Sequence, residues 1–224
     1  MKGAMSQAPS LPRLRSASRI RRIAIVVYRD VHIVDIAGPQ AVFESASRLL
    51  QQQAALAAYA YPVITLGLAA GPIRSSQGIT FLADRSYLDF DEDLDTLLVA
   101  GGQGNEVARD DPTLLDWLRR VAPRSRRFGS ICTGAFILAN AGLLDGKRAT
   151  THSGACKLLA EKHSRVQVDP EASYVRDGNV YSSAGVTAGT DIALALVKED
   201  WGDTLAEETA AASWLCRSRV SVSA

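Results

Sequence analysis

Short apolar runs alternate with longer segments of helical spacing along most of the chain. Four of these runs are rich in aliphatic residues, a pattern typical of strands buried on both faces of a parallel sheet. They occupy residues 23–28, 61–68, 96–100 and 127–131. The main sheet is therefore predicted to contain at least these four strands.

Helices are predicted between and after the strands. A loop over residues 30–38 leads to Pro39, which suits the first turn of a helix. Asp110 or Asp111 caps a later helix whose apolar face contains Leu114, Leu115, Trp117 and Leu118. Further predicted helices cover residues 39–46, 49–60, 133–141, 154–163 and 186–201.

Smaller elements complete the pattern. Residues 71–84 are predicted to form turns and short strands, as an antiparallel excursion from the main sheet. Residues 148–151 are predicted to be a short strand, and residues 174–182 a hairpin around Asp177, Gly178 and Asn179. Strands that alternate with helices predict an α/β fold: a single flavodoxin-like three-layer sandwich with a mostly parallel sheet and helices on both faces. The domain is predicted over residues 21–206, after a disordered basic arm at 1–20 and before an atypical tail at 207–224.

The composition excludes several classes of protein. A net charge of +1 over 224 residues provides no basic surface for nucleic acid, so no direct DNA binding is predicted. Three cysteines and three histidines without ligand spacing indicate no disulfide framework, metal site or cofactor, and fit a reducing cytoplasm. Residues 1–19 lack the apolar run of a secretory signal, and no segment is apolar enough to cross a membrane.

The chemistry is predicted to centre on Cys132. Ser130 and Gly134 lie two residues to either side of it, the spacing of a nucleophile elbow in which a strand turns sharply into a helix. At that helix N-terminus the thiolate is expected to be favoured, and the backbone N–H of Thr133 would face an oxyanion. The alternative is that Cys132 is a small buried apolar residue.

Other candidate site residues follow neighbouring strands. Gly101 and Gly102 end the strand at 96–100, where backbone N–H groups could complete an oxyanion hole. Asp35 stands among aliphatic residues and is predicted to be a general acid or base, or a hydrogen-bond acceptor from the cysteine. A helix cap before Pro39 is the alternative. His152 follows a strand and could exchange protons with the thiol, or could be purely structural.

Five segments together resemble the ThiJ/PfpI branch of the class I glutamine-amidotransferase-like superfamily. The similarity runs over about residues 22–201, nearly the whole predicted domain. The segments that carry it are residues 34–39, 98–102, 130–136, 141–152 and 183–191. The resemblance implies a small-molecule ligand and a homodimer.

Two subgroups of that family fit the sequence. Residues 130–136, 174–178 and 196–200 look most similar to the ligand-sensing N-terminal domain of AraC-type transcription regulators. The alternative is isonitrile hydratase, which would make Asp35 the acid/base and Cys132 the nucleophile on the isonitrile carbon, with Thr133 and Gly102 as hydrogen-bond donors. A third reading is a redox or carbonyl-stress protein that is switched by oxidation of Cys132.

The sequence departs from the family patterns at three places. Thr133 replaces the histidine of PfpI-type proteases, which argues against a peptidase. Ser153 stands where both subgroups commonly have tryptophan, and residues after about 206 resemble neither a linker nor a helix-turn-helix domain. The sequence therefore predicts a small-molecule-binding domain with a reactive cysteine.

Overall fold

A seven-stranded sheet forms the centre of the protein in the computed structural model, which describes residues 20–53, 59–185 and 187–213. The strand order is β10-β11-β7-β6-β1-β2-β5. All neighbouring pairs are parallel except β10 and β11. The strands of this sheet are β1 (Ile23–Val26), β2 (Val63–Gly67), β5 (Arg85–Ser86), β6 (Thr96–Val99), β7 (Arg127–Ile131), β10 (Tyr174–Asp177) and β11 (Val180–Ser183).

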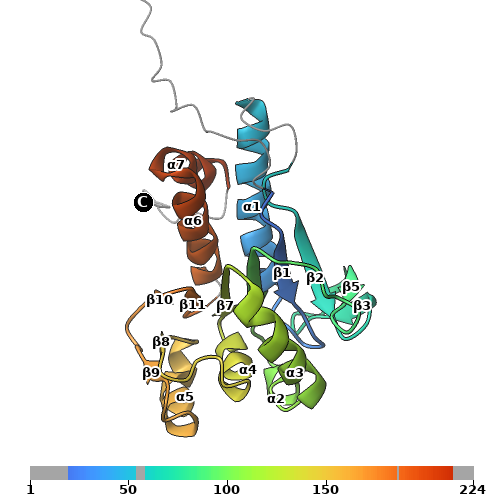
Figure 1. The fold of residues 1–224 in the computed structure, drawn as a ribbon, viewed down its shortest axis with the longest axis vertical. Helices are drawn as coiled ribbons and strands as arrows, with labels where there is room; N and C mark the ends of the chain where they lie inside the picture. The colour runs from blue at the N-terminus through green and yellow to red at the C-terminus, as the bar shows by residue number, and fades with distance from the viewer. Residues whose placement is uncertain (1–19, 54–58, 186, 214–224) are drawn as a thin grey trace, which may run out of the picture.

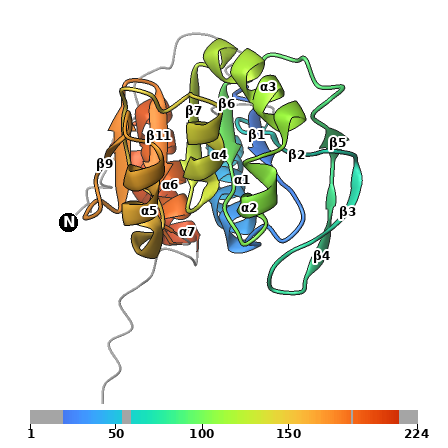
Figure 2. The ribbon, with the colours of Figure 1, turned by 90° about the horizontal axis from the view of Figure 1, so that it is seen from below.

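Two short sheets of two strands each lie outside the main one. The antiparallel pair forms the excursion predicted over residues 71–84, and Figure 2 shows it projecting from the body of the protein. The other pair is parallel, so the strand predicted at residues 148–151 is shorter and belongs to a separate sheet. These strands are β3 (Gly71–Arg74) with β4 (Thr80–Ala83), and β8 (Arg148–Ala149) with β9 (Gln167–Val168).

Helices cover both faces of the main sheet, so the predicted three-layer α/β fold is confirmed. One face carries the helices α1, α6 and α7, which contact one another and lie together in Figure 1. The other face carries α2, α3, α4 and α5. Their bounds are α1 (Val34–Gln52), α2 (Asn105–Ala108), α3 (Pro112–Val121), α4 (Gly134–Asn140), α5 (Cys156–Lys162), α6 (Ala188–Trp201) and α7 (Asp203–Ala212).

The pleat of β1 divides the core between the two faces. Ile23 and Ile25 belong to the apolar cluster under α1 and α6, while Ala24 and Val26 belong to the cluster under α3 and α4. All four side chains are fully buried. A strand buried on both sides explains why β1 reads as a continuous apolar run and does not alternate with polar residues.

Two helix predictions were wrong. The loop expected over residues 30–38 is largely helical, because α1 begins at Val34 and runs through Pro39 without interruption to Gln52. Pro39 is the sixth residue of α1, so the helix loses the one hydrogen bond that an N–H there would donate to the carbonyl of Asp35. The helix predicted over residues 49–60 is in part the end of α1, and residues 54–58 lie outside the described residues.

The C-terminal boundary also differs from the prediction. Helix α7 continues to Ala212, so the folded region extends beyond residue 206. The side chains of Leu205, Ala206 and Thr209 are buried, and α7 contacts α1 and α6. The predicted arm up to residue 19 and the tail from residue 214 lie outside the described residues.

Candidate active site

Cys132 lies at the sharp turn between β7 and α4. Its φ is 53°, a left-handed backbone conformation that non-glycine residues adopt at a cost. The turn needs a small residue after it, because a Cβ on Gly134 would lie 2.2 Å from the carbonyl oxygen of Val99. The predicted strand-to-helix turn is therefore present, and the glycine is needed where the helix meets β6.

Four residues converge at the ends of β1, β6 and β7. The carboxylate Oδ2 of Asp35 accepts a hydrogen bond of 2.9 Å from the backbone N–H of Gly101. A Cβ on Gly101 would lie 2.9 Å from that Oδ2, 2.8 Å from the Cβ of Cys132 and 2.6 Å from the amide nitrogen of Thr133. The structure thus brings Asp35, Cys132 and Thr133 together around a residue that has no side chain.

The backbone N–H groups of the Gly-Gly pair are not free. Gly101 donates to Asp35, and Gly102 donates to the hydroxyl Oγ1 of Thr133 at 2.9 Å. Their predicted role as oxyanion donors does not match this arrangement. The glycines instead tie the end of β6 to the first turn of α1 and to the residue after Cys132.

Asp35 is fully buried, and its position rules out the helix-cap alternative. It lies in the first turn of α1, and the residue before that helix is Ile33. The carboxylate Oδ1 has no hydrogen-bond partner, and the imidazole Nδ1 of His32 lies 3.5 Å from it. Burial raises the pKa of Asp35 to about 6, against the hydrogen bond from Gly101 and the charges of His32 and His152.

The predicted preference of Cys132 for the thiolate is wrong. Burial, and next the negative charge of Asp35, raise the pKa of the thiol to about 11, while hydrogen bonds from Thr133 act in the opposite direction. Helix α4 begins at Gly134 and spans only seven residues. In this structure the cysteine is therefore a neutral thiol at neutral pH.

A cavity of about 580 Å³ opens beside the thiol. Most of the residues that line it have polar side chains, among them three amides and two histidines. The lining residues are His32, Ser76, Gln77, Gly102, Gln103, Asn105, Glu106, Cys132, Thr133 and His152. Asp35 lies behind this wall and does not line the cavity.

The structure brings His152 to the cavity, as the sequence suggested, and adds His32. His152 precedes a short helical turn, where its Nδ1 accepts a hydrogen bond from the N–H of Gly154 at 3.2 Å. The hydroxyl of Thr151 donates to the carbonyl of Cys132 at 2.8 Å, which holds this segment beside the thiol. His32 had no role in the sequence analysis; its spacing of three residues from Asp35 places both at the start of α1.

The described residues contain neither a metal-binding cluster nor a membrane-spanning helix. Within residues 20–53, 59–185 and 187–213, no group of three or more His, Cys, Asp or Glu side chains could hold a metal ion. No helix in that part of the chain is long and apolar enough to cross a membrane.

Comparison with known proteins identifies the family. The model of the DJ-1/PfpI family matches residues 21–199. The chain belongs to the DJ-1/PfpI family. A ThiJ/PfpI family protein from Pseudomonas syringae has a similar structure, with a TM-score of 0.75 and 29% identity over 86% of this chain and 74% of that one.

Two curated relatives represent the two subgroups. Isonitrile hydratase from Pseudomonas putida is 38% identical over 128 residues, which cover 57% of this chain and 54% of the relative. The HTH-type transcriptional regulator CdhR from Pseudomonas aeruginosa is 34% identical over 136 residues, covering 61% of this chain and 40% of the regulator. The DJ-1/PfpI chain described here therefore matches about half or less of these relatives' lengths.

Proposed function

We propose that this DJ-1/PfpI domain binds a small molecule in the Cys132 cavity, as the ligand-binding domain of an AraC-type regulator would. The observation that carries the proposal is a buried thiol at a roomy cavity, beside which the N–H groups of Gly101 and Gly102 already have protein acceptors. Gly101 and Gly102 donate to protein acceptors, so the site holds a ligand without offering those donors to a developing oxyanion. Cysteine-centred binding without turnover fits this arrangement.

The lining limits the chemistry of the ligand. Among the described residues that line the cavity there is no lysine or arginine, and the carboxylate is that of Glu106. Amide, hydroxyl and imidazole groups provide hydrogen bonds to a polar molecule. The ligand is therefore a neutral or cationic polar molecule, and an anion of the same size binds less tightly.

This ligand class is tested with simple probes. Acetamide and methylguanidinium, with acetate as the anionic counterpart, are titrated into the ¹⁵N-labelled protein while the amides of Gly102 and Thr133 are followed by NMR. Methylguanidinium should bind more tightly than acetate, and Glu106→Gln should reduce that preference, whereas Glu171→Gln on the exposed surface should not. Tighter binding of acetate would contradict the proposal.

A second candidate is an isonitrile hydratase-like enzyme, which the 38% identity to that hydratase favours. The neutral thiol of Cys132 would add to the isonitrile carbon, forming the sulfur–carbon bond, while the thiol proton reaches the same carbon by way of Asp35. Water would then add to that carbon and the sulfur–carbon bond would break, returning the proton to sulfur and releasing an N-substituted formamide. Because Asp35 does not line the cavity, a water molecule in the cavity would carry this proton from Asp35 to the carbon.

Turnover separates the two candidates. Alkyl and aryl isonitriles are incubated with the wild type, Cys132→Ala and Asp35→Asn, and formamide is measured by chromatography. If the protein only binds its ligand, the wild type should give no more formamide than Cys132→Ala does. Many turnovers per wild-type molecule, lost in both variants, would establish the hydratase and overturn the binding-only proposal. The homodimer implied by the family stays a prediction.

A further inference from the structure

A second cavity, of about 380 Å³, lies at the same edge of the sheet as the Cys132 cavity. It opens where β1 and β2 end, and Val27 and Leu68 line it together with Ile73 from β3. Among the described residues, none lines both cavities. Ligands of open α/β sheets bind at the carboxyl ends of strands, and this volume falls within the usual range of small-molecule pockets.

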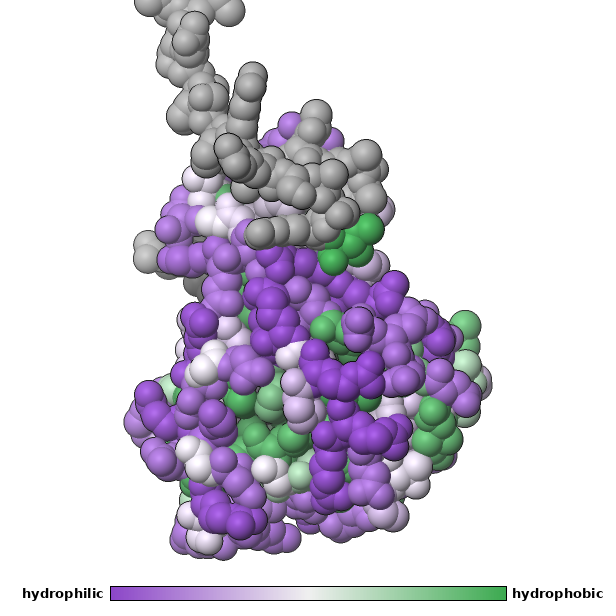
Figure 3. Space-filling view, in the orientation of Figure 1, coloured by the Kyte–Doolittle hydropathy of each residue, from purple (hydrophilic) through white to green (hydrophobic). Residues whose placement is uncertain are grey.

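The wall of this cavity is mainly apolar, and parts of it are uncovered. Leu68 is 55% exposed and Val107, on α2, is 80% exposed. Figure 3 shows apolar residues at the right-hand edge, where Figure 1 places β3 and β5. Exposed apolar side chains that gather around a hollow are typical of a binding surface.

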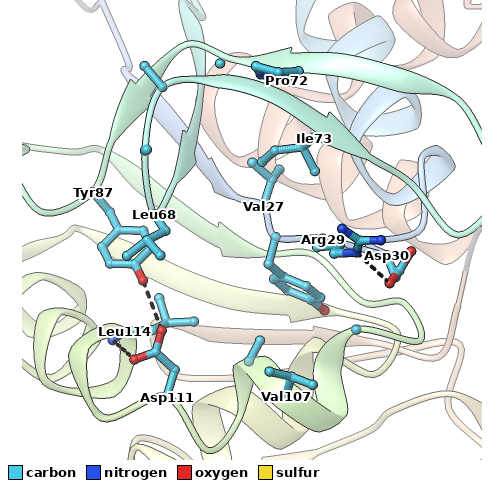
Figure 4. A pocket seen from close by; sticks show the side chains of 16 residues that line it. Val27, Arg29, Asp30, Leu68, Pro72, Ile73, Tyr87, Val107, Asp111 and Leu114 are labelled. Carbon is cyan, nitrogen blue, oxygen red and sulfur yellow. Dashed lines mark hydrogen bonds and ion pairs between the residues drawn. The ribbon is translucent and has the colours of Figure 1, made fainter.

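Acidic groups stand at two ends of the cavity, as Figure 4 shows. At one end, Asp111 accepts a long hydrogen bond of 3.3 Å from the hydroxyl of Tyr87 through Oδ2, while its Oδ1 caps α3. At the other end is Asp30. Its carboxylate Oδ2 lies 3.6 Å from Nε of Arg29, whose side chain is 84% exposed. The apolar walls thus lead to carboxylates that can accept further hydrogen bonds.

We propose that this cavity is a second small-molecule site, which binds an apolar molecule carrying one amine. The hydrocarbon part lies against Val27, Leu68 and Ile73, and the ammonium group donates to the carboxylate of Asp111. A molecule with a carboxylate in place of the amine is disfavoured, because Asp30 and Asp111 both line the cavity. Arg29 also lines it, but its side chain is 84% exposed and lies beside Asp30.

Two elements connect the second site to Cys132: the helix α2 and the side chain of Tyr28. In α2, Asn105 and Glu106 line the Cys132 cavity, while Val107 and Ala108 line the apolar one. Tyr28 also links them: it lines the apolar cavity, and its hydroxyl donates to the carbonyl of Ala100 at 2.7 Å. Burial raises the pKa of that hydroxyl, and the negative charge of Asp35 raises it further. An occupant of the apolar cavity therefore contacts groups that also shape the Cys132 site.

The test uses three molecules that share one skeleton: phenethylamine, 2-phenylethanol and phenylacetate. Each is titrated at millimolar concentration into the ¹⁵N-labelled protein, and the amides of Leu68 and Val107 are followed. Phenethylamine should give saturable shifts and bind at least tenfold more tightly than phenylacetate, with 2-phenylethanol between them. Absence of saturable shifts for all three, or equal binding of phenylacetate, would overturn the proposal.

Variants locate the site and its polar end. The double variant Leu68→Ser/Val107→Ser should weaken the binding of phenethylamine at least tenfold. The control Leu82→Ser/Leu158→Ser changes two exposed leucines outside both cavities and should leave the affinity unchanged. Asp111→Asn keeps the helix cap, since asparagine caps as well as aspartate. It should weaken phenethylamine and leave 2-phenylethanol unchanged; equal losses for both molecules would refute the role of the charge.

Coupling to Cys132 is measured separately from binding. The rate at which iodoacetamide alkylates Cys132 is followed by mass spectrometry of its peptide, with and without saturating phenethylamine. The rate should change at least twofold in the wild type and stay constant in Leu68→Ser/Val107→Ser. Equal wild-type rates would overturn the connection through α2 and Tyr28. This outcome is independent of isonitrile turnover, so it does not depend on the function proposed for the Cys132 cavity.

Discussion

The carboxylate of Asp35 is joined to the backbone N–H of Gly101 by a hydrogen bond of 2.9 Å, although the two residues are 66 positions apart in the chain. This bond closes the gap between the first turn of α1 and the end of β6. Since β1 and β6 are neighbours in the sheet, it lies where the chain order of the strands reverses direction. Crevices at such points are where open α/β sheets bind ligands, and here the crevice also holds Cys132.

Replacing Asp35 by asparagine should stabilise the protein at neutral pH. The pKa of Asp35 is raised from 3.8 to about 6 by burial, so the native state keeps the proton that the unfolded chain releases between pH 4 and 6. The stability contributed by that proton is present below about pH 4 and lost as the pH rises through 6. The free energy of unfolding of Asp35→Asn should therefore exceed that of the wild type by about 3 kcal/mol above pH 7. The two values should be equal near pH 4.

Urea unfolding from pH 4 to pH 8 measures this difference. Glu44→Gln removes a carboxylate from the exposed side of the same helix and serves as the control, with a difference that stays constant over the range. If the difference in unfolding free energy between Asp35→Asn and the wild type instead shrinks as the pH rises, the carboxylate is stabilised when ionised.

Cys132 should react slowly at neutral pH, and Asp35→Asn should accelerate it. With a pKa of about 11, only about one thiol in ten thousand is ionised at pH 7. Removing the negative charge of Asp35 makes the thiolate less unfavourable, so the profile of alkylation rate against pH should move to lower pH. Iodoacetamide labelling followed by peptide mass spectrometry gives the rate for Cys132, with the buried Cys156 as internal reference. No acceleration at pH 8 would mean that Asp35 does not act on the thiol.

Gly101→Ala should disrupt the site directly. The new methyl group would lie 2.6 Å from the amide nitrogen of Thr133 and 2.8 Å from the Cβ of Cys132, so backbone atoms must move. Overpacking of this kind costs about 2 kcal/mol of stability, and ligand binding at the Cys132 cavity should fall at least tenfold. Gly185→Ala meets no atom of the described residues within 4 Å and is the matched control. Thermal unfolding and NMR titration check both effects; equal stability of the two variants would refute the close packing.

A buried ion-pair cluster should hold α6 on the sheet. Arg127, 2% exposed in its side chain, contacts the carboxylates of Glu199 and Asp200 at the end of α6, and Asp200 is 1% exposed. Arg127→Met leaves a buried carboxylate with fewer partners and should cost about 3 kcal/mol. Arg124→Met removes an exposed arginine that pairs with exposed Asp91 and should change stability by less than about 0.5 kcal/mol. Urea unfolding compares them, and similar losses would show that the cluster contributes no more than a surface pair.

Local patterns along the chain were enough to predict the layout of the α/β fold. The apolar runs that become β1, β2, β6 and β7 could be read directly, because strands buried on both faces need continuous aliphatic residues. The turn at Cys132 was predictable from the small residues Ser130 and Gly134 on either side of it. The structure adds the reason for Gly134, since close approach to β6 leaves no room for a side chain there. In contrast, Pro39 suggested a helix start that the structure places at Val34, and no local signal indicated α7, whose burial against α1 and α6 stabilises it.

The chemical state of the site depends on contacts between segments that are distant in the chain. A helix N-terminus predicted a thiolate at Cys132, but burial beside the Asp35 carboxylate raises its pKa instead. Gly102 was expected to offer its N–H to a ligand, yet the hydroxyl of Thr133 accepts it. His32 and the apolar cavity beyond α2 likewise depend on which strand ends become neighbours. Desolvation and hydrogen-bond partners arise from contacts between distant segments, so the residue types of the site are written in the sequence and their protonation and availability are set by the fold.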